Sequence, residues 1–170
     1  VVNTGALPND VASNGNTTFT LGRGETTINA DEVDTGSGSE VDLIVDATAT
    51  DSGDLKLTGD AEIRVDGLQT NVNAAVSGNV MTGDLVLNSQ AGAGTLTVTL
   101  GEGQATLNNQ ISTTLDVDAS KVVASGSPAS ATSNPEIVVT GDGTVDVDLL
   151  DADLDASSFA GTLIITTEEL

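Results

Sequence analysis

The feature that most constrains the fold is an internal repeat of about twenty residues. Four segments place a Gly-x-Gly or Gly-x-Ala turn between apolar, strand-forming residues. Their first glycines are Gly22, Gly59, Gly101 and Gly141, at spacings of 37, 42 and 40 residues. A second type of segment lies between them, at 39–46, 82–88, 113–120 and 160–167. Self-similarity of this kind is typical of proteins in which each repeat stacks on its neighbours.

The repeat is strongest between two segments that are far apart in the chain. Residues 57–75 align with residues 139–157 without a gap, and 82–87 then align with 160–165 after a short deletion. Short turns also recur inside the units, as in Val117-Asp118-Ala119 and Leu154-Asp155-Ala156. We expect the glycines of the Gly-x-Gly segments to occupy turns that need positive φ.

Apolar residues alternate within these segments, as half-buried strands require, for example at Leu96, Val98 and Leu100. Helical spacing is not sustained anywhere, and residues 69–81 are interpreted as a loop or a single turn. The pattern predicts an all-β fold, a parallel β-solenoid (β-helix) of roughly 20-residue coils. The alternative is a β-sandwich, but sandwich cores usually contain a Trp or Tyr, and this chain has neither.

The predicted domain organisation is simple. Residues 1–16 are rich in turn formers and are expected to form an N-terminal arm or linker. Residues 17–170 are expected to form a single β-domain built of about four 40-residue repeats, interrupted by a small-polar loop at 124–135.

Charge and composition exclude several function classes. The chain has 26 acidic and four basic residues, a net charge of −22, which is unsuited to nucleic acid. No apolar run approaches the length of a membrane helix, so we expect no membrane insertion. The chain lacks His, Cys and Tyr, so the usual nucleophile–base pairs are missing and the protein is predicted not to be an enzyme. Acidity with few aromatics also suits disorder, but the regular alternation favours a folded chain.

The aspartates are the candidate ligands of a metal ion. Short carboxylates on a rigid β-scaffold suit calcium, and aspartates on successive coils would repel one another unless a cation bridged them. The candidate calcium ligands are Asp116, Asp118, Asp146, Asp148, Asp151, Asp153 and Asp155. The alternative is that these side chains only solvate an outer face or adapt the protein to high salt. An EF-hand loop is not present, because Ala156 and Thr162 occupy the positions of its Gly and final Glu.

The segment 139–166 resembles the repeated segments of Gram-negative S-layer proteins and large RTX-type adhesins. In those proteins a V/L-D/N-A-S turn precedes a small Gly and a Thr-rich aliphatic strand. Here the corresponding residues are Leu154 to Ser157, Gly161 and Thr162 to Thr166, with a fainter copy at Val117 to Ser120. The resemblance implies a calcium-bound β-solenoid, export without disulfides and self-assembly on the cell surface. The tandem GGxGxDxUx repeats of such adhesins are missing from this chain.

The predicted function is that of a structural, self-assembling, secreted protein, a protomer of a surface layer or extracellular filament. The alternative is an adhesin or spacer module of a larger surface protein, which binds a cell-surface glycan or a partner cell. The expected partners are copies of the same chain in head-to-tail contact. Residues 161–167 would offer an open strand edge, and Val1 and Val2 could be donated to a neighbour.

Overall fold

The computed structural model describes residues 2–3, 17–30, 43–49, 53–76, 79–122 and 136–167, and these form strands and turns without a helix. The strands are β1 (Val2–Asn3), β2 (Thr17–Thr20), β3 (Thr26–Ala30), β4 (Leu43–Asp46), β5 (Asp54–Gly59), β6 (Ile63–Leu68), β7 (Asn71–Asn73), β8 (Ala75–Val76), β9 (Asn79–Val80), β10 (Leu85–Ser89), β11 (Gly94–Thr99), β12 (Ala105–Asn109), β13 (Thr113–Asp118), β14 (Ile137–Gly141), β15 (Thr144–Leu150), β16 (Leu154–Asp155) and β17 (Thr162–Thr167).

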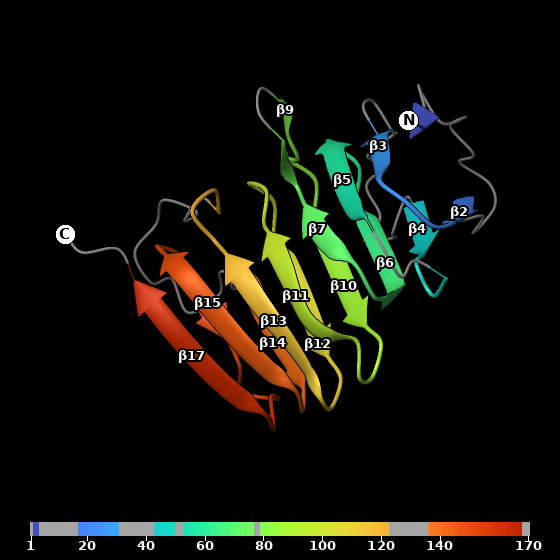
Figure 1. Ribbon diagram of the computed structural model, residues 1–170. Coiled ribbons are helices and arrows are strands. Elements are labelled where there is room, and N and C mark those ends of the chain that lie inside the picture. Colours follow the sequence, from blue (N-terminus) through green and yellow to red (C-terminus); the bar gives the residue numbers. More distant parts are fainter. Residues whose placement is uncertain are drawn as a thin grey trace, which may run out of the picture.

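The strands form two parallel sheets that lie face to face (Figure 1). Sheet A has eight strands in the order β1-β3-β5-β7-β11-β13-β15-β17, and sheet B has seven in the order β16-β14-β12-β10-β6-β4-β2. Apart from β8 and β9, strands that follow one another along the chain therefore alternate between the two sheets. Each turn of the chain, here called a coil, adds one strand to each sheet, and the coils stack on one another. Every pairing within these two sheets is parallel, which confirms the all-β prediction and does not suit the antiparallel sandwich considered as its alternative.

The coils repeat about every twenty residues, as the sequence predicts. Leu43 lies opposite Ile63, which lies opposite Leu85 and then Ala105, so these partners are 20, 22 and 20 residues apart. Aligned side chains of successive coils thus form rows that run along the stack. The inward rows are aliphatic, because every second residue of a strand faces the other sheet.

The core is a continuous ladder of small aliphatic side chains between the sheets. Val65, Leu87, Leu107 and Val139 are fully buried, and their strand neighbours are partly exposed. Stacked coils bury their apolar residues against the coils before and after them, which a single coil cannot do. The predicted alternation of inward and outward residues is confirmed.

Glycines mark the corners between the sheets, and only some of them have the expected positive φ. Gly59 and Gly141 do have positive φ, of 110° and 97°. Gly101 has an ordinary φ, and a Cβ there would collide with the carbonyl oxygen of Met81 on the preceding coil. The backbones of successive coils approach so closely at such corners that a side chain does not fit.

A second corner device is an aspartate or asparagine followed by alanine. The Asp46 Oδ1 accepts a hydrogen bond from the Thr48 backbone N–H at 3.1 Å, and Asn73, Asp118 and Asp155 accept equivalent bonds at 2.9, 2.9 and 2.8 Å. These are Asx turns, which end a strand and redirect the chain. They explain the recurrence of these pairs in the sequence: the expectation that the pairs mark turns is confirmed at Asn73, Asp118 and Asp155, whereas Asn29-Ala30 belongs to β3.

The interpretation of residues 69–81 as a loop or single turn is wrong. This segment contains β7, which belongs to sheet A, and then β8 and β9, which pair antiparallel and contact β5. Val72 supplies the inward residue of β7 and is buried. Its neighbours on the strand are asparagines, which conceal the alternation on which the sequence prediction relied.

Some predictions lie outside the described residues. The loop at 124–135 is one of them, and of the arm at 1–16 the structure describes only β1, which pairs in parallel with β3 of the same chain at Ile28 and Asn29. Within the described ranges, the structure contains no helix that is long and apolar enough to cross a membrane.

Candidate functional site

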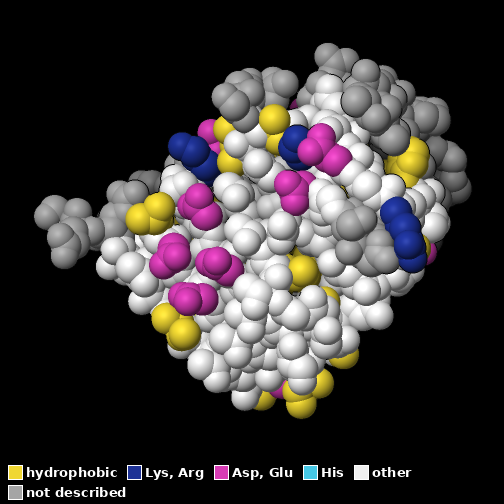
Figure 2. Space-filling view, viewed as in Figure 1, with side chains coloured by type: hydrophobic (Ala, Val, Ile, Leu, Met, Phe, Trp, Pro, Cys, Tyr) yellow, Lys and Arg dark blue, Asp and Glu magenta, His cyan; other side chains and the backbone are white. Residues whose placement is uncertain are grey.

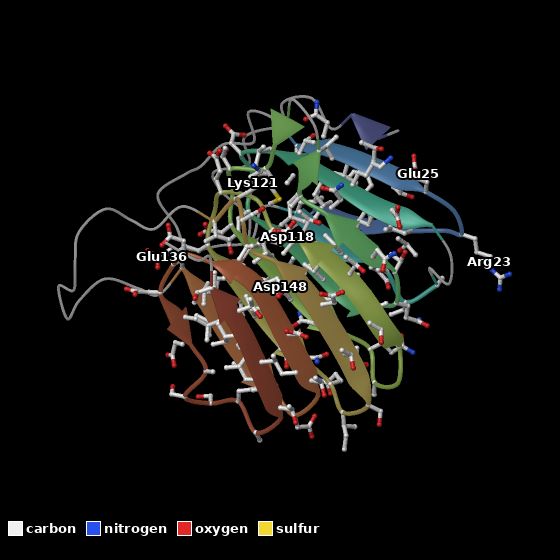
Figure 3. The ribbon with its side chains drawn as sticks, turned by 60° about the vertical axis from the view of Figure 1, so that its left-hand side comes forward. Arg23, Glu25, Asp118, Lys121, Glu136 and Asp148 are labelled. Atoms are coloured by element: carbon white, nitrogen blue, oxygen red, sulfur yellow. The ribbon has the colours of Figure 1, made fainter. Side chains whose placement is uncertain are left out.

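The most distinctive surface lies on the outer face of sheet A, near its C-terminal end. Asp116 and Asp118 project outward from β13 between inward-facing, buried residues, and Asp146 and Asp148 project in the same way from β15. The parallel register places Asp116 opposite Asp146 and Asp118 opposite Asp148. We call these four residues the acidic patch. Figure 2 shows acidic side chains gathered on this face, and Figure 3 shows Asp118 and Asp148 on neighbouring strands.

The acidic patch concentrates like charges at short range. Neighbouring strands lie about 4.8 Å apart, so carboxylates that are direct cross-strand partners repel one another. Two ion pairs with distances of 3.1 Å lie elsewhere, Lys56 with Glu25 and Arg64 with Asp66. A regular, paired arrangement of negative charges attracts cations to this face.

Rows of hydroxyl and amide side chains surround the patch. Thr95, Thr114, Thr144 and Thr162 are consecutive cross-strand partners and form an outward threonine row beside the aspartates. The Asn71 Oδ1 accepts a hydrogen bond from the Thr97 backbone N–H at 2.9 Å. The outward residues of β7, β11 and β13 are therefore short and polar, and carboxylates are concentrated on β13 and β15.

The other three predicted ligands lie away from the patch. Asp151 and Asp153 are exposed in the connection between β15 and β16, and Asp155 lies on β16 in sheet B. The Asp153 backbone N–H donates to the buried Glu136 at 2.9 Å. The structure thus divides the predicted set into the four residues of the patch and a separate acidic group at the end of sheet B.

Two of the seven carboxylates accept hydrogen bonds from backbone N–H groups. Asp118 and Asp155 each accept the N–H of the residue two positions ahead, at Ser120 and Ser157. The Ser157 backbone and side-chain hydrogen bonds hold the pKa of Asp155 below its ordinary value. These oxygens stabilise turns, which leaves fewer of them free for an ion.

The residues present fit a caged calcium ion poorly. Calcium takes six to eight oxygen ligands, usually from several carboxylates and carbonyls. In the described ranges no three acidic side chains come close enough to one another to hold a metal ion. What the acidic patch offers is two pairs of carboxylates on a flat face, an arrangement suited to cations that keep most of their water.

Sequence reasoning missed a buried polar cluster inside the stack. The Asn109 side chain is fully buried; its Oδ1 accepts from the Ser89 hydroxyl at 2.8 Å, and its Nδ2 donates to the carbonyls of Thr113 and Thr144 at 3.0 and 2.7 Å. Ser89, Asn109 and Thr144 belong to successive coils, so this asparagine ties them together. The signal in the sequence was the polar residue at an inward position of β12.

The end of the stack is the second distinctive surface. On β17, Ile164 faces outward and is 46% exposed, whereas Ile165 faces the core side and is still 44% exposed. Leu154, Phe159 and Leu163 of the same coil are only partly buried. Scattered exposed aliphatics are normal, but this group terminates the core ladder itself.

Comparison of the chain with protein-family models, with curated proteins and with solved structures gave no match.

Proposed function

We propose that this protein is a structural module, a parallel β-solenoid that joins an extracellular assembly through the end of its stack. The observation that supports this most directly is the exposed C-terminal coil, where, among the described residues, the apolar ladder ends in exposed side chains and β17 has no outer neighbour. β17 carries no charged residue between Thr162 and Thr167. An uncharged, apolar strand edge is a template for pairing with another chain.

The rest of the surface supports a structural role. The corners are built from Asx turns and close backbone contacts, and the outward residues of β11 and β13 in sheet A are short and polar, in register with one another. Such a surface offers a scaffold of constant shape along its length. The lack of His, Cys and Tyr removes the common catalytic nucleophiles and bases, so the proposal includes no enzymatic activity.

Calcium enters the proposal as a counter-ion for the acidic patch. With a net charge of −22, the folded chain is destabilised by its own repulsion, and a divalent cation between Asp116 and Asp146 or between Asp118 and Asp148 would reduce it. Cations that bind the folded state more strongly than the unfolded state raise its stability. These properties are best suited to a secreted protomer of a surface layer or filament whose acidic patch is neutralised by calcium.

The test is self-association of the purified chain. Sedimentation velocity over a range of concentrations, with calcium and with EGTA at the same ionic strength, should show species larger than the monomer. Electron micrographs of the same samples would show whether these are regular. Ile164→Lys places a charge on the outward face of β17 and should reduce association, whereas Ile111→Lys, at an exposed corner, should not.

A second candidate is a spacer or adhesin module, in which a further coil of a longer chain covers β17. The same exposed ladder favours it, because a coil from the same polypeptide would bury these residues equally well. A chain that stays monomeric in both conditions at every concentration would favour this candidate over self-assembly. Binding to a glycan surface in a pull-down would then identify the adhesin.

A further inference from the structure

The two ends of the stack differ in a way that restricts how copies can meet. At the N-terminal end, Ile28 of β3 is fully buried and Leu21 is 6% exposed, and β1 pairs with part of the β3 edge. At the C-terminal end, the inward Ile165 is 44% exposed, and in the described ranges β17 pairs only with β15. The N-terminal end is therefore covered in part on its sheet A side, whereas β2 of sheet B pairs only with β4 in the described ranges, and at the C-terminal end neither β17 nor β16 has an outer neighbour there.

A head-to-tail filament would join these unlike ends. A row of outward side chains runs along sheet A from Ile164 at the C-terminal end through Asp146, Asn71 and Asp54. If the register between β3 and β5 is extended by one residue, the row ends with Glu25 at the N-terminal end. An unbroken head-to-tail register would thus set Ile164 against the Glu25 carboxylate, which is paired with Lys56 at 3.1 Å. Charge and apolar surface do not match in that contact.

The β17 strand is instead complementary to itself. If two copies pair antiparallel about Ile164, the outward Thr162 meets Thr166 of the other copy and Ile164 meets its own counterpart. The inward Leu163 then lies opposite Ile165 of the other copy. Each residue of β17 thus lies opposite one of the same polarity, on the same face of the sheet. The pairing brings no charged side chain of β17 to the new edge.

We propose that two copies of the chain join tail to tail through antiparallel β17 strands, about a two-fold axis at Ile164. This inference rests on the proposed function, because it names the partner and the geometry of the self-association. An axis normal to the sheets brings sheet A against sheet A and sheet B against sheet B, so that both layers continue across the interface. The contact is isologous and joins two copies, so a filament or layer would grow from this dimer through its other surfaces.

The acidic group of the same coil gives the contact an unusual salt dependence. Asp151, Asp153 and Asp155 lie near the sheet B side of the open end, and a tail-to-tail pair brings two such groups together. Their repulsion is screened by salt. Dimer formation should therefore strengthen as ionic strength rises, because the attraction is apolar and the opposing force is electrostatic.

A single cysteine tests the geometry directly, because the chain contains none of its own. In Ile164→Cys the two thiols would face each other, at a Cα separation of about 4.5–5.5 Å, which is within disulfide range. Mild oxidation should give a disulfide-linked dimer on non-reducing gels. Thr162→Cys and Thr166→Cys are the matched controls: each alone should cross-link poorly, whereas an equimolar mixture should form the mixed dimer.

The outcomes separate the two proposals. Self-association of the unmodified chain without cross-linking of Ile164→Cys would overturn the tail-to-tail geometry and leave self-assembly standing. A chain that remains monomeric at all concentrations and salt conditions would overturn both. Circular dichroism melts of each reduced cysteine variant test whether the fold is retained, which we expect because the side chain at position 164 faces outward.

Discussion

Gly67 and Leu149 occupy equivalent bulges in opposite sheets, and both have a left-handed backbone, with φ of 68° and 57°. The gapless alignment of 57–75 with 139–157 pairs these two residues. In each case the register shifts at this point, so that the residue is skipped by the neighbouring strand. Glycine adopts this conformation freely, whereas leucine does so at a cost.

Replacement of Leu149 by glycine should therefore stabilise the fold. A non-glycine residue in the left-handed conformation destabilises the folded state by about 1–2 kcal/mol. Glycine avoids this cost, but its greater flexibility in the unfolded chain offsets about 0.5–1 kcal/mol of the gain. We expect Leu149→Gly to raise the free energy of unfolding by about 0.5–1 kcal/mol in urea titrations. Gly67→Ala should do the reverse, since its new Cβ would also meet Thr48. A lower urea midpoint for Leu149→Gly would show that the bulge is not strained.

Two first glycines of the repeated segments should respond differently to alanine. A Cβ at Gly101 meets the Met81 carbonyl, while a Cβ at Gly22 meets nothing within 4 Å, and neither has positive φ. Gly101→Ala should cost about 1–3 kcal/mol, the usual range for overpacking. Gly22→Ala should be neutral or stabilise slightly by restricting the unfolded chain. Equal effects in thermal melts would contradict the close contact between coils.

The Asp46 turn should make part of the stability depend on pH. The Thr48 side-chain and backbone hydrogen bonds lower the pKa of Asp46 below its ordinary 3.8. A lowered pKa in the folded state contributes stability that is present above pH 3.8 and is lost as the pH falls through the folded pKa. Thr48→Val should raise the pKa of Asp46 in a carboxyl NMR titration and lower the melting temperature at pH 7.

The matched control for this turn is Asp46→Asn. Asn73 makes the same turn with an amide, accepting the Ala75 N–H at 2.9 Å. Asp46→Asn should therefore keep the turn while removing this contribution to the pH dependence. An unchanged acid limb of stability in Asp46→Asn would show that other carboxylates dominate it.

Calcium should act through the acidic patch. Cross-strand like charges cost about 0.2–1 kcal/mol, so Asp116→Asn should raise the melting temperature in EGTA and reduce the further rise caused by calcium. Asp142→Asn, a corner residue outside the patch, removes the same charge and should leave the calcium response intact. Identical melting temperatures in calcium and EGTA, at fixed ionic strength, would refute the calcium proposal. Equal stabilisation by sodium would support simple screening.

The sequence predicted the strands and the inward residues well, because both follow from one local rule. Val145 and Val147 face the core and Asp146 and Asp148 face outward, as alternation requires. The period near twenty residues also followed from spacing alone. Asp116 and Asp146 are cross-strand partners in sheet A, as expected for aspartates on successive coils.

The sheet to which each strand belongs could not be predicted from the sequence, because the two halves of a coil have similar sequences. The segment 57–75 covers β5, β6 and β7, and its partner 139–157 covers β14, β15 and β16, so the alignment maps sheet A strands onto sheet B strands. For the same reason Asp155 was grouped with Asp146, although they lie in different sheets. The inward Asn109 was missed because its partners, the Ser89 hydroxyl and the carbonyls of Thr113 and Thr144, lie partly on other coils, and their approach is set by the stacking of the coils.

This equivalence of half-coils bears on how such a gene can change length. A corner after either sheet leads into the same kind of strand, so recombination between two corners yields a chain that can still wind. Gain of a whole coil extends the stack and preserves every later strand in its sheet. Gain of half a coil moves all later strands to the opposite sheet, and the acidic patch would then emerge on the other side of the molecule.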